Sequence, residues 1–338
     1  MQKGINFNEK IFVAGSNGMV GSAICRELIK SGYGLKENNG LLLTPTRKEL
    51  NLLDYRDVNT WFTLNKPSIV ILAAAKVGGI YANNQKPSDF ILENLKIQNN
   101  VTELAWRHGV KKFLFLGSSC IYPKFSQQPI KEEYLLTDSL EKTNEFYAIA
   151  KIAGIKLCES LRKQHNFNAI SLMPTNLYGP RDNYHLENSH VLPALIRKFS
   201  EAKEFNKSEV ICWGTGKPLR EFLYVDDLAE ACIFVLEKCF GDIKCKENYI
   251  KDDLSWLNVG SKYEISIKDL AQKIALKCGY TGKIIWDESK PDGTPRKKLD
   301  ISKLSSLGWE AKTNLDDGIS KTLESFVKEK NSEKLRLV

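Results

Sequence analysis

Short apolar runs and longer amphipathic stretches alternate along the first half of the chain. The runs are four to eight residues long and are bounded by glycine, proline or polar residues, which predicts buried β-strands. The stretches between them carry apolar residues at intervals of three and four, which predicts helices. The expected strands cover residues 11–14, 40–43, 68–75, 112–116 and 168–173, and the expected helices cover 22–31, 54–64, 88–108 and 144–163. This alternation predicts a parallel, doubly wound α/β sheet.

After residue 179 the alternation of expected strands and helices becomes less regular. Residues 181–190 are polar and are expected to form a loop. We expect helices over 193–203, 226–238, 265–278, 302–307 and 314–328, and strands over 210–213 and 221–225. Asp226 or Asp227 is the expected N-cap of its helix. The predicted architecture is a Rossmann-type domain (residues 1–178 plus about 220–260), a smaller, mostly α C-terminal domain for the substrate (about 179–219 plus 261–330), and a solvated tail (331–338).

Composition and charge narrow the classes of function. The chain has 338 residues, 42% hydrophobic and 27% charged, as in an ordinary soluble globular protein. Its net charge of +8 is spread in short blocks, which argues against nucleic-acid binding and suits a small polyanion such as a nucleotide. Eight cysteines stand singly, without C-x-x-C or metal-ligand spacing, so we expect no metal and reduced thiols in a cytoplasmic protein. We see no signal-peptide pattern and no apolar run of about 18 residues, so no membrane span is expected.

A glycine-rich turn separates the first expected strand from the first expected helix. Its sequence is Gly15-Ser16-Asn17-Gly18-Met19-Val20-Gly21. Glycines let the backbone approach a pyrophosphate, and the amides at the start of the next helix carry partial positive charge. The second strand is followed by no acidic residue that could hold a ribose 2′-hydroxyl; Arg47 stands there and can pair with a 2′-phosphate. This favours NADP as the cofactor, and the alternative is that Arg47 is a solvated surface residue.

A second group of polar residues combines a strand end with a helix. Ser118 follows strand 112–116, and Tyr147 and Lys151 lie four residues apart on one face of helix 144–163. An ammonium beside a phenol is expected to lower the pKa of the tyrosine toward neutrality. Ser, Tyr and Lys together can then exchange a proton with a carbonyl that exchanges hydride with the cofactor. Cys120 is a candidate second acid–base group at that carbonyl, and an inert thiol is the alternative.

With these motifs the chain resembles the GDP-L-fucose synthase family of extended short-chain dehydrogenase/reductases. The similarity runs from Phe12 to about Phe326. It rests on residues 15–21, 46–54, 73–79, 117–123, 147–151, 173–180, 189–191, 220–223 and 290–297. The glycine turn and Tyr-x-x-x-Lys are shared across the superfamily, whereas the Ser-Ser-Cys, Ser-His-Val and Lys-Pro-Asp-Gly segments are far more specific.

The resemblance implies a bifunctional epimerase/reductase that converts GDP-4-keto-6-deoxy-D-mannose to GDP-L-fucose with NADPH. Carbons C3 and C5 are α to the C4 ketone, so removing a proton there makes an enolate whose oxygen Ser118 and Tyr147 can hold. Cys120 is implied as the base and His190 as the acid, with free pKa values of about 8.5 and 6.5. Tyr147 then donates the proton when hydride adds to C4, and Lys151 anchors the nicotinamide ribose.

The same resemblance assigns ligand-binding residues. The implied cofactor-binding residues are Gly15, Ser16, Asn17, Gly18, Met19, Val20, Gly21, Arg47, Leu116, Gly117, Ser118, Ser119, Lys151, Pro174, Thr175, Asn176, Leu177 and His190. The implied substrate-binding residues are Lys198 and Arg220 near the diphosphate and Trp213 and Asp292 near the base and ribose. One departure is Asn17, where some family members have an arginine that reaches the 2′-phosphate, so Arg47 would act with less help.

Other nucleotide-sugar enzymes of the same fold remain alternatives: a C4 epimerase, a 4,6-dehydratase or a synthase of the colitose type. Dehydratases place acidic residues just after the strand-end serine or threonine, where this chain has Ser119 and Cys120. A non-catalytic NADP-binding regulatory protein is a further alternative, although such proteins often lose part of the Ser-Tyr-Lys set. As a partner we expect a second copy of the chain, paired through the helical runs 91–106 and 149–161, and neither nucleic acid nor a membrane.

Overall fold

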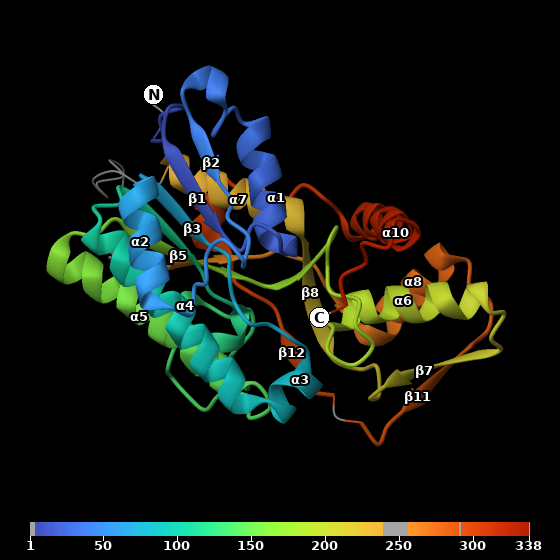
Figure 1. Cartoon of the computed structure of the whole chain (residues 1–338). Helices are drawn as coiled ribbons and strands as arrows, with labels where there is room; N and C mark the ends of the chain where they lie inside the picture. Colours follow the sequence, from blue (N-terminus) through green and yellow to red (C-terminus); the bar gives the residue numbers. More distant parts are fainter. Residues whose placement is uncertain (1–3, 239–255, 291, 338) are drawn as a thin grey trace.

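The computed structural model describes residues 4–238, 256–290 and 292–337 (Figure 1). Its larger part is a six-stranded sheet with the order β2-β1-β3-β4-β5-β9, in which every pair of neighbours is parallel. The strands are β1 (Lys10–Ala14), β2 (Leu41–Leu43), β3 (Ile69–Leu72), β4 (Lys112–Leu116), β5 (Ala169–Pro174) and β9 (Trp256–Val259). The strand order reverses between β1 and β3, so the predicted doubly wound sheet is confirmed.

Helices cover both faces of this sheet. They are α1 (Met19–Lys30) and α7 (Val225–Lys238) on one face, and α2 (Tyr55–Asn65), α4 (Pro87–Arg107) and α5 (Glu145–His165) on the other (Figure 1). Side chains alternate along a strand, so Ile11 and Val13 join the core under α1 and α7, whereas Phe12 and Ala14 join the core under α2, α4 and α5. Burial on both faces explains why these strands read as continuous apolar runs.

The smaller part is mixed rather than mostly α. One sheet joins β10 (Glu264–Ser266), β8 (Leu219–Tyr224) and β12 (Arg296–Lys297), with β6 (Asn176–Tyr178) also paired to β8, and β7 (Glu209–Trp213) pairs with β11 (Lys283–Asp287). Its helices are α6 (Val191–Glu204), α8 (Ile267–Cys278) and α10 (Leu315–Asn331), whereas α9 (Ser302–Ser306) packs against β9 of the larger part and α3 (Ile80–Gln85) contacts α4. Strands β7 and β8 agree with the strands expected over 210–213 and 221–225, but β6, β10, β11 and β12 were not expected. With two or three residues each, β6, β10 and β12 are too short for an alternating pattern to be recognised, so the expected mostly helical character is corrected.

Two segments lie differently from expectation. Strand β8, which the sequence placed at the return to the larger part, pairs with β6, β10 and β12; the domain boundaries themselves stay a prediction. The tail after α10 also returns to the protein: Leu335 packs against the core of the smaller part, and the carbonyl of Arg336 accepts a hydrogen bond from the Tyr184 N–H at 2.9 Å. The tail is therefore anchored rather than solvated throughout.

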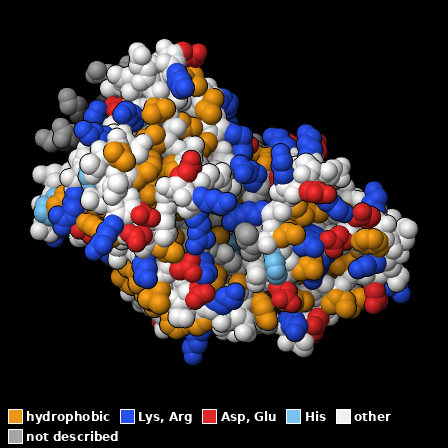
Figure 2. Space-filling model, viewed as in Figure 1, with side chains coloured by type: hydrophobic (Ala, Val, Ile, Leu, Met, Phe, Trp, Pro, Cys, Tyr) orange, Lys and Arg blue, Asp and Glu red, His pale blue; other side chains and the backbone are white. Residues whose placement is uncertain are grey.

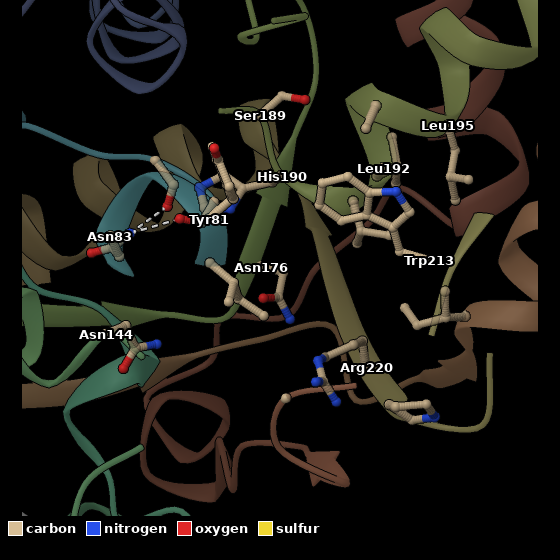
Figure 3. Close-up of a pocket in the computed structure, with 18 of the residues that line it drawn as sticks. Tyr81, Asn83, Asn144, Asn176, Ser189, His190, Leu192, Leu195, Trp213 and Arg220 are labelled. Carbon is tan, nitrogen blue, oxygen red and sulfur yellow. Dashed lines mark hydrogen bonds between the residues drawn. The ribbon is translucent and has the colours of Figure 1, made fainter. Parts of the chain in front are cut away.

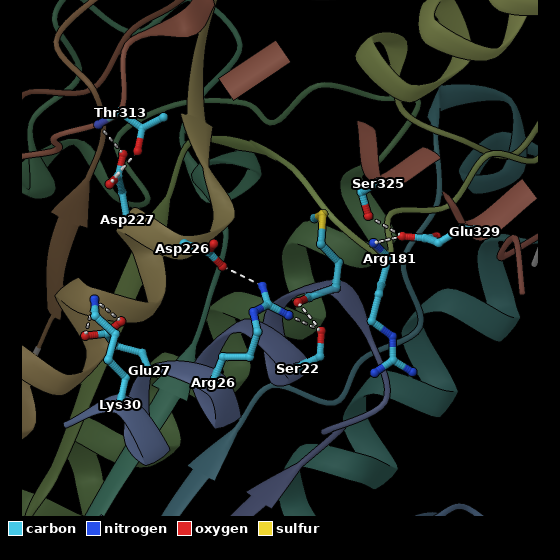
Figure 4. Close-up of polar contacts among 11 residues, drawn as sticks. Ser22, Arg26, Glu27, Lys30, Arg181, Asp226, Asp227, Thr313, Ser325 and Glu329 are labelled. Carbon is cyan, nitrogen blue, oxygen red and sulfur yellow. Dashed lines mark hydrogen bonds and ion pairs between the residues drawn. The ribbon is translucent and has the colours of Figure 1, made fainter. Parts of the chain in front are cut away.

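Asp226 and Asp227 lie inside the first turn of α7, which starts at Val225, so neither is the N-cap (Figure 4). Asp226 accepts a hydrogen bond from the guanidinium of Arg26 at 2.5 Å. Asp227 accepts from the N–H and the hydroxyl of Thr313, at 3.0 and 3.1 Å. These contacts tie α7 to α1 and to the segment before α10. Within the described ranges, none of the helices combines the length and apolar character that crossing a membrane requires.

Candidate active site

Ser118 and Cys120 lie where β4 ends. A short 3₁₀ turn, Ser119–Ile121, follows, and the Ser118 hydroxyl caps it by accepting a hydrogen bond from the Cys120 N–H at 3.2 Å. A Cβ at Gly117 would lie 2.3 Å from the sulfur of Met173 on β5, so a side chain there would have to displace the Met173 thioether. The turn brings the side chains of Ser118 and Cys120 into one cleft.

Tyr147 and Lys151 approach this strand end from α5. The Lys151 ammonium donates to the Leu116 carbonyl at 2.8 Å and lies 5.9 Å from the centroid of the Tyr147 ring. Burial lowers the pKa of Lys151 to about 8. Burial, and then the nearby Cys120, raise the pKa of Tyr147, and a hydrogen bond with Ser118 offsets only part of this. The expected lowering of the Tyr147 pKa by Lys151 is therefore wrong for this structure, in which burial dominates and Tyr147 is a protonated phenol at neutral pH.

Positive charge surrounds the Cys120 thiol. The ammonium of Lys297, on β12, lies 3.3 Å from the sulfur. Burial raises the pKa of this thiol, but the charge of Lys297, the Ser118 hydroxyl and the charge of Arg220 more than offset it, so the pKa of Cys120 lies below its ordinary value. For Cys158 and Cys232, by contrast, burial raises the pKa. Cys120 thus differs from the inert thiols of the core.

His190 lies at the N-cap position of α6 and lines the same cleft. Its side chain is open to the cleft, yet the surrounding protein lowers the pKa of His190 by desolvation, and the charge of Lys297 lowers it further. The imidazole is therefore mostly neutral at pH 7 in the free protein.

The cleft lies between the two parts of the molecule and has a volume of about 330 Å³, within the usual range of small-molecule sites. Ser118, Cys120, Tyr147 and His190 line it, and so do Lys198, Trp213, Arg220 and Asp292. Figure 3 shows His190, Trp213 and Arg220 arranged around the space. In Figure 2, Lys and Arg side chains gather along the middle of this face, where the two parts meet. The structure thus brings together the implied catalytic groups, except for Lys151, and the implied substrate-binding residues.

The substrate-side residues form two pairs. The Lys198 ammonium donates to the Ile211 carbonyl at 3.0 Å and lies 5.5 Å from the centroid of the Trp213 ring, which is 46% exposed. Arg220 donates to the Leu219 carbonyl at 2.9 Å and to the Asp292 carbonyl at 3.5 Å. The Asp292 carboxylate accepts from the N–H and the hydroxyl of Thr215, both at 2.8 Å, so it holds a turn as well as facing the cleft.

The glycine turn has the geometry of a phosphate cradle. Gly15 has a φ of +86°, and a Cβ on Gly21 would lie 2.1 Å from the Gly15 carbonyl oxygen. A Cβ on Gly18, by contrast, would meet only the Gly15 carbonyl at 3.4 Å and the Arg336 guanidinium at 3.8 Å, so space beside Gly18 is open. The hydroxyl of Ser16 is buried without a hydrogen-bond partner in the described residues. An open cradle with an unsatisfied hydroxyl fits a bound phosphate.

The remaining implied cofactor residues are distributed around this turn and the cleft. Arg47 is exposed beyond β2, so its guanidinium is accessible to a ligand. Thr175 and Asn176 donate from their side chains to the Glu221 carbonyl at 3.1 and 2.7 Å. Asn176 and Leu177 line the cleft. The described residues contain no cluster of His, Cys, Asp or Glu that could hold a metal ion.

Two basic residues that received no role from the sequence lie at these sites. Lys297 ends the Lys290–Lys297 segment, whose specificity could have drawn attention to it. Arg336 lies in the tail, and burial together with the charge of Arg181 lowers its pKa, while Asp182 acts in the opposite direction. Arg181 follows Gly179-Pro180, and its N–H donates to Glu329 at 2.9 Å (Figure 4). No pattern in the sequence could have placed Arg336 beside Gly18.

A Rossmann-type sheet with an acid–base cleft beside it defines a class of nucleotide-dependent enzymes, and the chain belongs to the NAD dependent epimerase/dehydratase family, whose sequence profile matches residues 11–246. It is similar to GDP-L-fucose synthase 1 of Arabidopsis thaliana, with 57% identity over 319 residues, covering 94% of this chain and 93% of that protein. It is 50% identical over 322 residues to the GDP-L-fucose synthase of Escherichia coli K12, covering 94% and 97%. A structure of a GDP-L-fucose synthetase from Naegleria fowleri bound to NADP is similar with a TM-score of 0.84 and 26% identity, covering 98% and 97%. The resemblance seen in the sequence is thereby confirmed.

Proposed function

We propose that this protein converts GDP-4-keto-6-deoxy-D-mannose to GDP-L-fucose, by epimerisation at C3 and C5 followed by reduction at C4 with NADPH. The observation that carries the proposal is the meeting of a thiol of lowered pKa, an imidazole, a serine and a protonated tyrosine in one cleft. The similarity to GDP-L-fucose synthases over 94% of the chain supports the same activity.

The epimerisation needs a stabilised enolate. Ser118 and Tyr147 both line the cleft and can donate hydrogen bonds to the C4 oxygen. Because burial keeps the Tyr147 phenol protonated, the donor is present when negative charge develops on that oxygen. Such preorganised donors stabilise the charged intermediate more than water does.

Proton transfer at C3 and C5 requires a base on one side and an acid on the other. The lowered pKa of Cys120 makes its thiolate available near neutrality, which suits the base. His190 has a lowered pKa in the free protein, but a substrate diphosphate brings negative charge into the cleft and raises the pKa of the imidazole toward the working range. His190 then suits the acid that returns a proton to the opposite face.

Reduction uses the same groups once the epimerisations are complete. NADPH supplies the hydride that adds to C4. Tyr147 gives its proton to the C4 oxygen, with the Ser118 hydroxyl as its hydrogen-bonded neighbour. Lys151 is fixed by the Leu116 carbonyl and is suitably placed to anchor the nicotinamide ribose.

The cofactor phosphates have several candidate partners. The amides of the glycine turn and the unsatisfied Ser16 hydroxyl suit the pyrophosphate. Arg47 suits the 2′-phosphate, because it is exposed at the end of β2 and a guanidinium binds phosphate bidentately. Arg336 joins this set, since its guanidinium borders the open side of Gly18.

The GDP group of the substrate fits the outer part of the cleft. Lys198 and Arg220 can bind its diphosphate, and the exposed Trp213 ring offers a face for the base. Asp292 can accept a ribose hydroxyl in addition to its bonds from Thr215. These roles divide the cleft into two ends. The nucleotide end is lined by Lys198, Arg220, Trp213 and Asp292, and the sugar end by Ser118, Cys120, Tyr147 and His190.

We also propose a homodimer formed through α4 and α5, which pack side by side (Figure 1). Leu92 on α4 and Ile149 on α5 are 55% and 42% exposed, as unpartnered interface residues would be. A cytoplasmic location agrees with the six described cysteines, which are free; Cys239 and Cys245 lie outside the described residues.

Incubation with GDP-4-keto-6-deoxy-D-mannose and NADPH tests the function, with product stereochemistry read by NMR. The wild type should form GDP-L-fucose. Cys120→Ser should slow epimerisation about 10²–10⁴-fold and release some 6-deoxy-D-sugar by reduction of the unepimerised ketone. GDP-L-fucose formed by the variant at the wild-type rate would remove Cys120 from the mechanism. Activity only on a 3-deoxy keto-sugar would instead identify a synthase of the colitose type.

A further inference from the structure

We propose that Lys297 is a positioning residue that holds the Cys120 sulfur as a thiolate facing the sugar end of the cleft. The contact is direct, with 3.3 Å between the ammonium nitrogen and the sulfur. Both residues also line a small hollow next to the main cleft, so the pair borders the space where a keto-sugar would lie. This inference deepens the proposed function and rests on it where the chemistry of epimerisation is concerned.

The backbone around Lys297 is fixed on both sides, so its position is built in rather than accidental. Strand β12 pairs with β8, with Lys297 opposite Arg220. The N–H of the next residue, Lys298, donates to the Gln128 side chain at 2.9 Å, and the Leu299 N–H donates to Glu221 at 2.9 Å. A pair that is separated by 177 positions in the sequence is thus held together by strand pairing.

Alternation along β12 explains why this lysine, and not its neighbour, reaches the thiol. Arg296 points outward and makes two hydrogen bonds to Glu264, at 2.9 and 2.5 Å. Lys297 therefore points to the opposite side, toward the cleft. Its ammonium makes no salt bridge to a carboxylate among the described residues, so its charge is available to the sulfur.

The other charged or titratable groups near the Cys120 sulfur contribute less to its ionisation than Lys297 does. Arg220 lies on β8, and its positive charge lowers the pKa of Cys120 less than the charge of Lys297 does. Tyr147 approaches from α5 as a neutral phenol, and His190 responds to Lys297 with a lowered pKa. Glu141 borders the small hollow, but its carboxylate accepts a hydrogen bond from the Thr143 N–H and forms a salt bridge with Lys124. Lys297 contacts the sulfur directly, and of the charges that lower the pKa of Cys120 its charge acts most strongly, which makes it the group that sets the ionisation of the thiol.

The experiment measures the pH dependence of Cys120 alkylation by iodoacetamide in the free protein, read by peptide mass spectrometry. For Lys297→Met we expect the rate at pH 7 to fall about tenfold or more, because the thiolate is the reacting species. Lys297→Arg should restore most of the reactivity, since it keeps the charge. Lys298→Met is the matched control, as it removes a positive charge one residue away from the contact. An unchanged pH profile in Lys297→Met would overturn the proposal.

A second readout connects the contact to the reaction. The wild type in D₂O should exchange the C3 and C5 protons of GDP-4-keto-6-deoxy-D-mannose, and Lys297→Met should lose this exchange by a factor similar to its loss of alkylation, while still binding NADPH. Exchange at the wild-type rate in Lys297→Met would contradict the role of Lys297. If the wild type itself fails to exchange these protons, the proposed function is wrong, whereas the alkylation profile still tests the contact between Lys297 and Cys120.

Discussion

The buried carboxyl group of Asp182 should make the free energy of unfolding depend on pH, by an amount that follows from its surroundings. Its side chain is 3% exposed; one carboxyl oxygen accepts the Asn183 N–H at 2.7 Å, and the other has no hydrogen-bond partner in the described residues. Burial raises the pKa of Asp182 to about 7, and neither the Asn183 N–H nor Arg336 offsets this. The folded protein therefore holds this proton more tightly than the unfolded chain does. The stability associated with the neutral carboxyl is fully present below about pH 4 and is lost as the pH rises to about 7.

The magnitude follows from the difference between the two pKa values. A shift from an ordinary value near 4 to about 7 corresponds to roughly 4 kcal/mol of lost stability at pH 8, of which more than half is lost between pH 5 and pH 8. Asp182→Asn cannot ionise and keeps an oxygen that can accept the Asn183 N–H. The variant should therefore gain roughly 2–3 kcal/mol over the wild type between these two pH values.

Urea unfolding of both proteins at pH 5 and pH 8 measures this difference. Comparing the two pH values cancels any effect of the amide that does not depend on pH. Asp57→Asn, at an exposed position on α2, is the matched control and should show no such gain. A difference between wild type and Asp182→Asn that stays constant from pH 5 to pH 8 would refute the reasoning, because it would mean that Asp182 is ionised and stabilised throughout this range.

The remaining predictions concern the active site and the cofactor. Tyr147→Phe should reduce the rate of C4 reduction by about 10²–10⁴-fold while NADPH still binds, as measured by NADPH oxidation and by fluorescence titration; a normal reduction rate would exclude Tyr147 as the proton donor. Arg47→Ala should raise the KM for NADPH and leave that for NADH nearly unchanged, and equal effects on both would contradict a contact with the 2′-phosphate. Arg336→Met should weaken NADPH binding about tenfold, with Lys334→Met as the exposed control in the same tail; equal affinity in the two variants would remove Arg336 from the cofactor site.

The sequence by itself predicted five of the six strands of the main sheet, all except β9, and several of the polar residues that line the cleft. Continuous apolar runs separated by amphipathic stretches can bury themselves only as parallel strands covered by helices, and Gly15–Gly21, Ser118 and Tyr147 fall at the strand and helix ends where such a sheet holds its ligands. These features are local, because spacing and residue type along the chain are enough to define them.

Only the tertiary structure decided which distant groups meet and how strongly burial acts on them. The pairing of β12 with β8 sets Lys297 against Cys120, and the returning tail sets Arg336 against Gly18. The spacing of Tyr147 and Lys151 suggested a lowered tyrosine pKa, yet the depth of burial raises it. The physical reason is that Coulomb and desolvation energies depend on distance and dielectric in three dimensions, which a linear pattern does not contain.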